Sequence, residues 1–222
     1  MQDQKSLLLT KLVAEGVLRS SKVKQAMSRV PREGFLPDRV RSHAYIDCPL
    51  PIGYGQTISA PHMVAMMAEA LEVEAGQIVL EIGSGSGYHA AVLAELVTPI
   101  TLTPRGHIYS VEIIPELAAF ARKNLKQAGY EDRVTIILGD GSLGHPEQAP
   151  YDRISVTAAA PQIPEALVMQ LKKEGMLVIP VGNTLFYQKL LKVRKQEETK
   201  TSLSIISDVA FVPLRGRNGW KK

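Results

Sequence analysis

The sequence predicts an α/β fold built on a mostly parallel β-sheet that is preceded by helices and finished by an antiparallel hairpin. Two observations carry this prediction. From position 78 onward, short β-branched runs alternate with helical segments, as in parallel strands connected by helices. Near the C-terminus, two longer strand patterns are joined only by a charged turn that has no room for a helix. The length of 222 residues suits one domain with a large single core.

The first sixty residues predict two helices and then an irregular segment. The helices are expected over Ser6–Glu15 and Ser21–Val30, with Gly16 as a stop signal and a serine pair as a cap signal between them. Residues 31–61 are rich in proline and glycine, which favours a loop that contains at most a short strand.

The remaining residues predict alternating helices and strands. The expected helices are His62–Leu71 (opened by Pro61), Tyr88–Leu96, Pro115–Ala128 and Pro164–Leu171. The expected strands are Ile78–Ile82, Ile108–Glu112, Val134–Leu138, Arg153–Thr157 and Met176–Pro180, followed by the hairpin strands Leu185–Lys192 and Ser204–Val212. We expect Thr98–Gly106 to be an inserted loop and the last strand to run antiparallel to the others. The order of the strands in the sheet does not follow from the sequence.

Composition narrows the function classes. The net charge is +4, but basic and acidic residues are interspersed, so solvated surface is the simpler interpretation and no nucleic-acid partner is expected. The apolar stretches are too short to span a bilayer, and Met1 to Lys11 lacks the features of a secretory signal, so no membrane partner is expected. Cys48 is the only cysteine, which excludes an internal disulfide and favours a cytoplasmic location.

The most informative segment joins a buried strand to a helix through a glycine-rich turn, Glu81-Ile82-Gly83-Ser84-Gly85-Ser86-Gly87. Glycine suits such a turn because it adopts positive φ and lets a ligand approach the bare backbone. A dinucleotide-binding turn would place a glycine where this chain has Tyr88, which disfavours a dehydrogenase. The segment instead resembles the acidic-x-Gly-x-Gly-x-Gly signature of S-adenosylmethionine enzymes. A structural turn without a ligand is the alternative.

The next two strands end in further candidate ligands. Glu112 ends the second strand, where an acidic side chain accepts hydrogen bonds from both ribose hydroxyls; a solvated strand-end charge is the alternative. The third strand leads into Gly139-Asp140-Gly141, where methyltransferases hold adenine. Asp140 is a candidate acceptor for the exocyclic amine of adenine, and a turn-forming Asp-Gly pair is the alternative.

Several segments together resemble the protein-L-isoaspartate O-methyltransferase family. The most specific is Pro49–Met63, which contains Gly55-Gln56-Thr57-Ile58-Ser59. Similarity continues through Val30–Glu33, the glycine turn, Pro150–Ile154, Ala158–Pro161, Glu174–Gly182 and Phe211–Leu214, so it covers essentially the whole chain in order. The chain departs from some relatives in the basic, glycine-rich segment Arg215–Trp220.

The resemblance implies a Rossmann-like class I methyltransferase fold, with a mostly parallel doubly wound sheet, a C-terminal antiparallel hairpin and N-terminal helices. We expect one domain, residues 1–222, in which 1–61 form the N-terminal helices and a substrate-side loop and 62–222 form the cofactor-binding α/β core. It implies a cytoplasmic, monomeric enzyme without a metal. Such an enzyme transfers a methyl group from S-adenosylmethionine to the α-carboxyl of isoaspartyl residues in damaged proteins and so initiates their repair.

The resemblance assigns the catalytic serine to Ser59, and Thr57 is a second candidate for holding the substrate carboxylate. The expected cofactor-binding residues are Ile58, Ala60, Pro61, His62, Glu81, Gly83, Ser84, Gly85, Ser86, Gly87, Glu112, Ile113, Asp140 and Gly141.

The chemistry needs little from the protein beyond placement. A carboxylate nucleophile is already ionised at neutral pH, so we expect a site of backbone and hydroxyl groups with no His–Asp pair. Ser59 is expected at the cap of the helix that Pro61 opens, and capping alone is the alternative to catalysis. His89 and His145 are expected to be incidental, with no spacing that supports a metal site.

Two other functions stay open at this point. A methyltransferase of small molecules or nucleic acids should lack the Gly55–Ser59 segment, and this chain has it. A binding module that keeps the fold without turnover should have a broken glycine turn or no Ser59, and both are intact.

Overall fold

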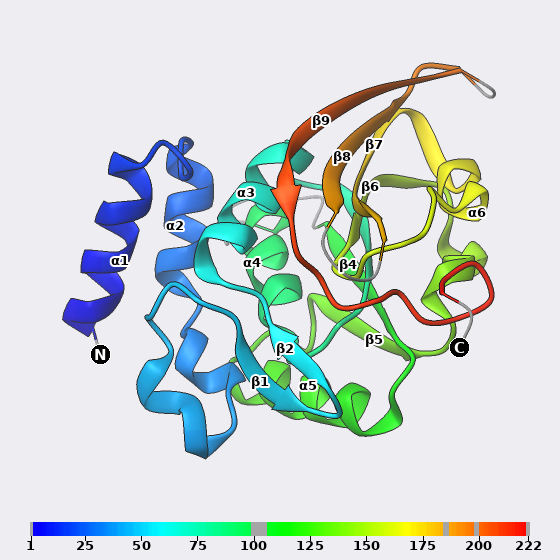
Figure 1. Ribbon diagram of the computed structural model, residues 1–222. Helices are drawn as coiled ribbons and strands as arrows, with labels where there is room; N and C mark the ends of the chain where they lie inside the picture. Colours follow the sequence, from blue (N-terminus) through cyan, green and yellow to red (C-terminus); the bar gives the residue numbers. More distant parts are fainter. Residues whose placement is uncertain (1, 99–105, 184–186, 198–199, 221–222) are drawn as a thin grey trace.

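The computed structural model describes residues 2–98, 106–183, 187–197 and 200–220. Figure 1 shows a twisted sheet at the centre, two helices side by side at the N-terminal end and a small hairpin at the lower centre. The large sheet has seven strands in the order β5-β4-β3-β6-β7-β8-β9, and β1 pairs with β2 in a separate sheet. The strands are β1 (Leu50–Gly53), β2 (Gln56–Ile58), β3 (Ile78–Ile82), β4 (His107–Glu112), β5 (Val134–Leu138), β6 (Tyr151–Val156), β7 (Leu171–Gly182), β8 (Gln188–Lys195) and β9 (Thr201–Val209).

The helices alternate with these strands as expected. They are α1 (Gln2–Ala14), α2 (Ser21–Arg29), α3 (Pro61–Leu71), α4 (Tyr88–Val97), α5 (Pro115–Gln127) and α6 (Glu165–Met169). Short 3₁₀ segments are η1 (Arg32–Phe35), η2 (Asp38–His43), η3 (Gly141–Leu143) and η4 (Pro146–Gln148). None of the helices in the described part of the chain is long and apolar enough to cross a membrane.

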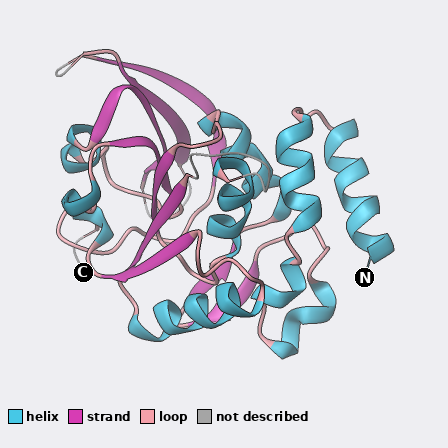
Figure 2. Ribbon diagram, turned by 180° about the vertical axis from the view of Figure 1, so that it is seen from behind, coloured by secondary structure: helices cyan, strands magenta, loops and turns pink. Residues whose placement is uncertain are grey.

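The parallel sheet is covered on both faces, which confirms the doubly wound arrangement. Strands β3 to β7 pair in parallel, and the chain moves from β3 through β4 to β5 in one direction and from β6 to β7 in the other. Because such crossovers are right-handed, α4 and α5 lie on one face and α6 on the other. Two buried clusters reflect this: Val79 belongs to the cluster with α4 and α5, and its neighbour Leu80 to the cluster with α6. Figure 2 shows the helices on either side of the strands.

The N-terminal helices extend the first of these clusters. Leu12, Leu18, Val23 and Met27 are almost fully buried, and the Ser20 hydroxyl accepts a hydrogen bond from the Val23 N–H as the cap of α2. The first helix begins earlier than the predicted Ser6, whereas the second agrees with its prediction to within one residue. The predicted loop 31–61 is more ordered than expected, since it contains η1, η2 and both strands of a hairpin.

The C-terminal strands differ from the prediction in one respect. The strand that runs against its neighbours is β8, which pairs antiparallel with β7 and with β9. Strand β9 therefore points the same way as the parallel strands, so the expectation of a last strand antiparallel to the rest is wrong. The two strands of the predicted hairpin are antiparallel to each other, but a hairpin pattern does not fix which of its strands runs with the rest of the sheet. The start of the predicted strand Leu185–Lys192 lies outside the described residues.

Helix α6 is shorter and strand β7 is longer than predicted. Helix α6 ends at Met169, and Leu171 already begins β7, which extends through Gly182. Glu174 has φ of 61° within this strand, so the segment that looked like a helix end and a loop is an irregular extension of the sheet. The predicted inserted loop Thr98–Gly106 lies almost entirely outside the described residues.

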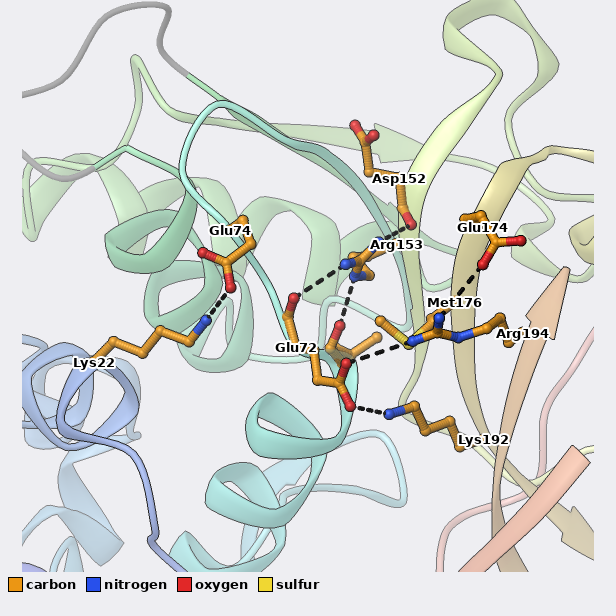
Figure 3. A network of polar contacts seen from close by, with 10 residues as sticks. Lys22, Glu72, Glu74, Asp152, Arg153, Glu174, Met176, Lys192 and Arg194 are labelled. Atoms are coloured by element: carbon orange, nitrogen blue, oxygen red, sulfur yellow. Dashed lines mark hydrogen bonds and ion pairs between the residues drawn. The ribbon is translucent and has the colours of Figure 1, made fainter. Parts of the chain in front are cut away.

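A polar network fastens α3 to the sheet at the end opposite the strands' carboxyl ends (Figure 3). Arg153 of β6 donates hydrogen bonds to the carbonyls of Leu71 and Glu72 at 2.6 and 3.1 Å. The Glu72 carboxylate accepts a hydrogen bond from Lys192 of β8 and lies 3.7 Å from Arg194, also in β8. The hydrogen bond from Lys192 lowers the pKa of Glu72. The ionised Glu72 therefore stabilises the fold at neutral pH, and this stabilisation is lost as the pH falls through the lowered pKa.

Candidate active site

The glycine turn after β3 has the backbone that its sequence predicts. Gly83, Gly85 and Gly87 all have positive φ, at 95°, 54° and 86°. A side chain at Gly83 would collide with the Thr157 hydroxyl, which lies 2.7 Å from the Gly83 carbonyl and 3.0 Å from the Ile82 carbonyl. Thr157 directly follows β6, the strand next to β3, so the neighbouring strand end fixes the turn.

Glu112 is held rigidly at the end of β4. Its carboxylate accepts hydrogen bonds from the backbone N–H of Gly85 at 2.9 Å and of Ile114 at 3.0 Å. The residue is 5% exposed and contributes to the wall of a cavity. Each carboxylate oxygen can accept more than one hydrogen bond, so both oxygens keep capacity for a pair of neighbouring hydroxyl groups.

One cavity lies over the carboxyl ends of the parallel strands. Its open volume, counted together with the solvent at its mouth, is about 800 Å³. One side is the glycine turn with Glu112, and another is the backbone segment of Gln56 to Ser59. Apolar side chains such as Leu117 and polar groups share the lining. Parallel sheets bind ligands at this end, so the position agrees with the fold.

A buried arginine holds the backbone of Ser59 by a hydrogen bond to its carbonyl. Arg32 is fully buried and donates to the Ser59 carbonyl at 2.8 Å and to the Ala44 carbonyl at 2.9 Å. Its guanidinium also lies over the ring of Tyr88, which lines the cavity. Burial lowers the pKa of Arg32. Arg32 thus fixes the backbone of Ser59, whose hydroxyl forms no hydrogen bond with a described residue and is free for a ligand.

The expected capping role of Ser59 is wrong. The residue that caps α3 is Ala60, with no side-chain hydrogen bond, and the free N–H of His62 is instead satisfied by Asp47 at 2.9 Å. Asp47 also lies 2.9 Å from Nδ1 of His62, so the site neighbourhood does contain a His–Asp pair, contrary to expectation. Neither residue lines the cavity. Asp47 reaches the helix because the loop before β1 folds back over it, a contact between residues fifteen positions apart.

Glu81 lies beneath the cavity and is fully buried. Its carboxylate accepts a hydrogen bond from Ser110 of β4 and lies 3.0 Å from Nδ1 of His89 in α4. The Ser110 hydroxyl is in turn 2.6 Å from that of Ser84 in the glycine turn. His89, which the sequence suggested to be incidental, lines the cavity. The acidic residue of the turn motif is therefore joined to the cavity through His89.

Asp140 supports the C-terminal segment. Its carboxylate accepts hydrogen bonds from the Ser142 N–H and hydroxyl at 2.9 and 2.7 Å and from the Arg217 N–H at 2.7 Å. Gly216 approaches it so closely that a side chain there would collide with the carboxylate. These contacts agree with the turn-forming alternative, and the adenine contact of Asp140 stays a prediction. The neighbouring Gly141 does line the cavity.

The structure brings most of the predicted site residues to this one cavity. Those that line it are Thr57, Ile58, Ser59, Gly83, Ser84, Gly85, Ser86, Glu112, Ile113 and Gly141. Those that do not line it are Ala60, Pro61, His62, Glu81, Gly87 and Asp140. In the described part of the chain, no group of three or more His, Cys, Asp or Glu side chains gathers closely enough to hold a metal ion.

Sequence reasoning missed several lining residues. Thr157 follows a parallel strand directly, so the rule that selected Glu112 could have found it. Arg215 lines the cavity from the segment after β9, and no local pattern signals that this segment crosses the strand ends. In that segment the Leu214 N–H donates to the Ala159 carbonyl, and the Ala159 N–H donates to the Val212 carbonyl. The ring N–H of Trp220 donates to the Ala159 carbonyl as well.

Comparisons with known proteins place this geometry in context. Residues 3–219 match the family model described as Protein-L-isoaspartate(D-aspartate) O-methyltransferase (PCMT). A protein-L-isoaspartate O-methyltransferase of Hyperthermus butylicus is 57% identical over 97% of this chain and 90% of its own length. One of Staphylothermus marinus is also 57% identical, over 93% of this chain and 91% of its own.

Solved structures agree with these relatives. A Plasmodium falciparum protein assigned as a protein-L-isoaspartate O-methyltransferase, solved in complex with S-adenosyl-L-homocysteine, superposes with a TM-score of 0.82 at 29% identity. The match covers 96% of this chain and 98% of that one. A second protein-L-isoaspartate O-methyltransferase gives a TM-score of 0.84 at 30% identity over 96% of this chain and 66% of its own.

Proposed function

This chain belongs to the protein-L-isoaspartate(D-aspartate) O-methyltransferase family, and we propose that it methylates the α-carboxylate of isoaspartyl residues in damaged proteins. It is an S-adenosylmethionine-dependent protein carboxyl methyltransferase. The observation that supports the proposal best is that Ser59 shares one cavity with the glycine turn and with Glu112.

The cavity suits S-adenosylmethionine by its donor and acceptor set. Glu112 offers two anchored carboxylate oxygens to the ribose hydroxyls, and the glycine turn leaves backbone exposed beside them. When bound, the cofactor supplies a methyl group on a positively charged sulfur. Ser59 and Thr57 line the same cavity, where their hydroxyls would donate to the substrate carboxylate and orient it toward that methyl group.

The transfer requires no proton to move. One lone pair of the carboxylate forms the new oxygen–carbon bond while the carbon–sulfur bond breaks and leaves its electron pair on sulfur. The protein's task is therefore to hold two reactants about 3 Å apart in line and to exclude water. Hydroxyl groups can orient the carboxylate without acting as bases. The contacts between His62 and Asp47 then hold the first turn of α3 in place and do not remove a proton.

The ester formed at this carboxylate is reactive in the peptide itself. In an isoaspartyl residue the main chain continues through the β-carboxyl, so the α-ester faces the amide nitrogen of the following residue. Attack by that nitrogen closes a succinimide ring, the amide proton leaves with the methoxy group as methanol, and hydrolysis opens the ring to aspartyl and isoaspartyl products. Methylation thereby starts the conversion of the damaged linkage back to the normal one.

This chemistry gives the experiment that tests the proposal. A peptide with an amidated C-terminus and an isoaspartyl residue as its only carboxylate is incubated with the protein and S-adenosylmethionine and followed by mass spectrometry. We expect the peptide to gain one methyl group and then to lose methanol as the succinimide forms. A peptide that stays unmodified, or a methyl group that persists on a side chain other than the isoaspartyl residue, would contradict the proposal.

The setting of this activity is part of the same proposal. The partners are proteins and peptides that contain isoaspartyl residues, with no nucleic acid or membrane, and the enzyme acts as a monomer in the cytoplasm. The interspersed charges and the single cysteine, Cys48, support this setting.

A further inference from the structure

His89 is a buried, titratable lining residue that the proposed chemistry leaves without a task. It is 8% exposed and lies in the first turn of α4, directly after the glycine turn. Nδ1 faces the Glu81 carboxylate at 3.0 Å, whereas Nε2 is buried and has no hydrogen-bond partner among the described residues. A buried ring nitrogen without a partner is costly, so a group that enters the cavity is the natural candidate to satisfy it.

The hydrogen bond to Glu81 decides what Nε2 can accept. Because Nδ1 faces a carboxylate, Nδ1 carries the hydrogen, and in the neutral ring Nε2 then presents a lone pair. Both Glu81 oxygens are engaged by protein donors, one by His89 and the other by Ser110. Glu81 itself does not line the cavity, so His89 stands between the buried negative charge and the ligand.

The charges around His89 favour a cationic ligand group. Glu81 has no solvent exposure, and its field acts through a region of low dielectric constant. Among the described lining residues, Arg215 in the segment after β9 is the one lysine or arginine.

We propose that Nε2 of His89 accepts a hydrogen bond from the α-ammonium group of the methionyl part of the cofactor, with Glu81 holding the ring in place. This inference rests on the proposed function, since it assigns the amino-acid end of the same cofactor. Glu81 then acts as a positioning residue. His89 makes the direct contact with the cofactor, although the turn motif alone would suggest Glu81 for that contact.

The test separates the two ring nitrogens by substitution. In His89→Asn the amide nitrogen stands two bonds from Cβ, as Nδ1 does, so the hydrogen bond to Glu81 is kept and only the far nitrogen is lost. The matched control is His43→Asn, at an exposed position in η2. Binding is measured by calorimetry with three ligands: S-adenosylhomocysteine, its analogue without the amino group, and 5′-methylthioadenosine, which lacks the amino-acid part. Thermal unfolding of each variant reports whether the fold is kept.

We expect His89→Asn to bind S-adenosylhomocysteine roughly 10- to 100-fold more weakly than the unaltered protein, the effect of one hydrogen bond to a charged group. The other two ligands should bind both proteins equally, and His43→Asn should bind all three normally. An equal loss for the ligand without the amino group would show that the carboxylate is the partner and overturn the inference. Equal loss for all three ligands, or loss for none, would overturn it too.

The outcomes also separate this inference from the proposed function. If the unaltered protein binds none of the three ligands, the cofactor assignment itself fails and the inference falls with it. If the unaltered protein binds S-adenosylhomocysteine and methylates the isoaspartyl peptide while His89→Asn binds all ligands normally, only the role of His89 is wrong.

Discussion

Replacing Ser59 with alanine is expected to lower the turnover of an isoaspartyl peptide by about 10- to 1000-fold, the range for a lost positioning contact or hydrogen bond. The Ser59 hydroxyl has no hydrogen bond to a described residue, and Ala60 is the residue that caps α3. Its removal should therefore change the free energy of unfolding by no more than about 0.5 kcal/mol. Cofactor affinity should also stay nearly constant, because Glu112 and the glycine turn are untouched.

Steady-state rates, calorimetric cofactor affinity and thermal unfolding of Ser59→Ala together measure this prediction. Ser204→Ala, at an exposed position on β9, is the matched control and should behave as the unaltered protein. Turnover of Ser59→Ala within twofold of normal would mean that the hydroxyl does not orient the substrate. A large fall in stability with a proportionate loss of activity would point to a structural role instead.

Replacing Gly85 with valine should reduce cofactor binding by more than about 100-fold. Gly85 lines the cavity with φ of 54°, and a Cβ there would already lie 3.4 Å from the Ile52 side chain. The two methyl groups beyond that Cβ would occupy the space that the ligand needs, and the left-handed backbone costs a branched residue about 1–2 kcal/mol. Two effects are thus mixed in this variant: backbone strain and filled space.

Gly129→Val separates these effects. Gly129 has φ of 76°, and a Cβ there would meet nothing within 4 Å, in the connection between α5 and β5. Both variants should lose similar stability in thermal unfolding, but only Gly85→Val should lose binding of S-adenosylhomocysteine in calorimetry. If Gly85→Val binds the ligand as tightly as Gly129→Val does, the turn is not the cofactor site.

The part of the site that the sequence predicts is the part that depends on local order along the chain. Gly83, Gly85 and Gly87 follow a buried strand directly, and that context suffices to predict positive φ and a ligand-binding turn. The sequence predicts Glu112 in the same way, because the carboxyl end of a strand in a parallel sheet lies at the ligand-binding edge. Ser59 came from the family resemblance, since a lone serine before a helix has capping as its simplest explanation.

The features that the sequence hides depend on contacts between distant segments. The carboxylate of Asp47, and not the hydroxyl of Ser59, accepts a hydrogen bond from the first turn of α3, because the loop before β1 folds onto the helix. Nothing in the local sequence indicates this contact. His89 meets Glu81 only because α4 packs over β3. The direction of β9 was mispredicted because a hairpin pattern fixes the relation of its two strands to each other and not to the rest of the sheet.

Whether this cavity methylates the isoaspartyl carboxylate is measured most directly with two peptides that differ only in that linkage. Initial rates of methyl transfer from labelled S-adenosylmethionine are measured for an isoaspartyl peptide and for its aspartyl twin of the same sequence. We predict rapid transfer to the isoaspartyl peptide and none above background to its twin. Equal rates for the two peptides, or no transfer to either, would show that the protein is not a methyltransferase selective for the isoaspartyl linkage.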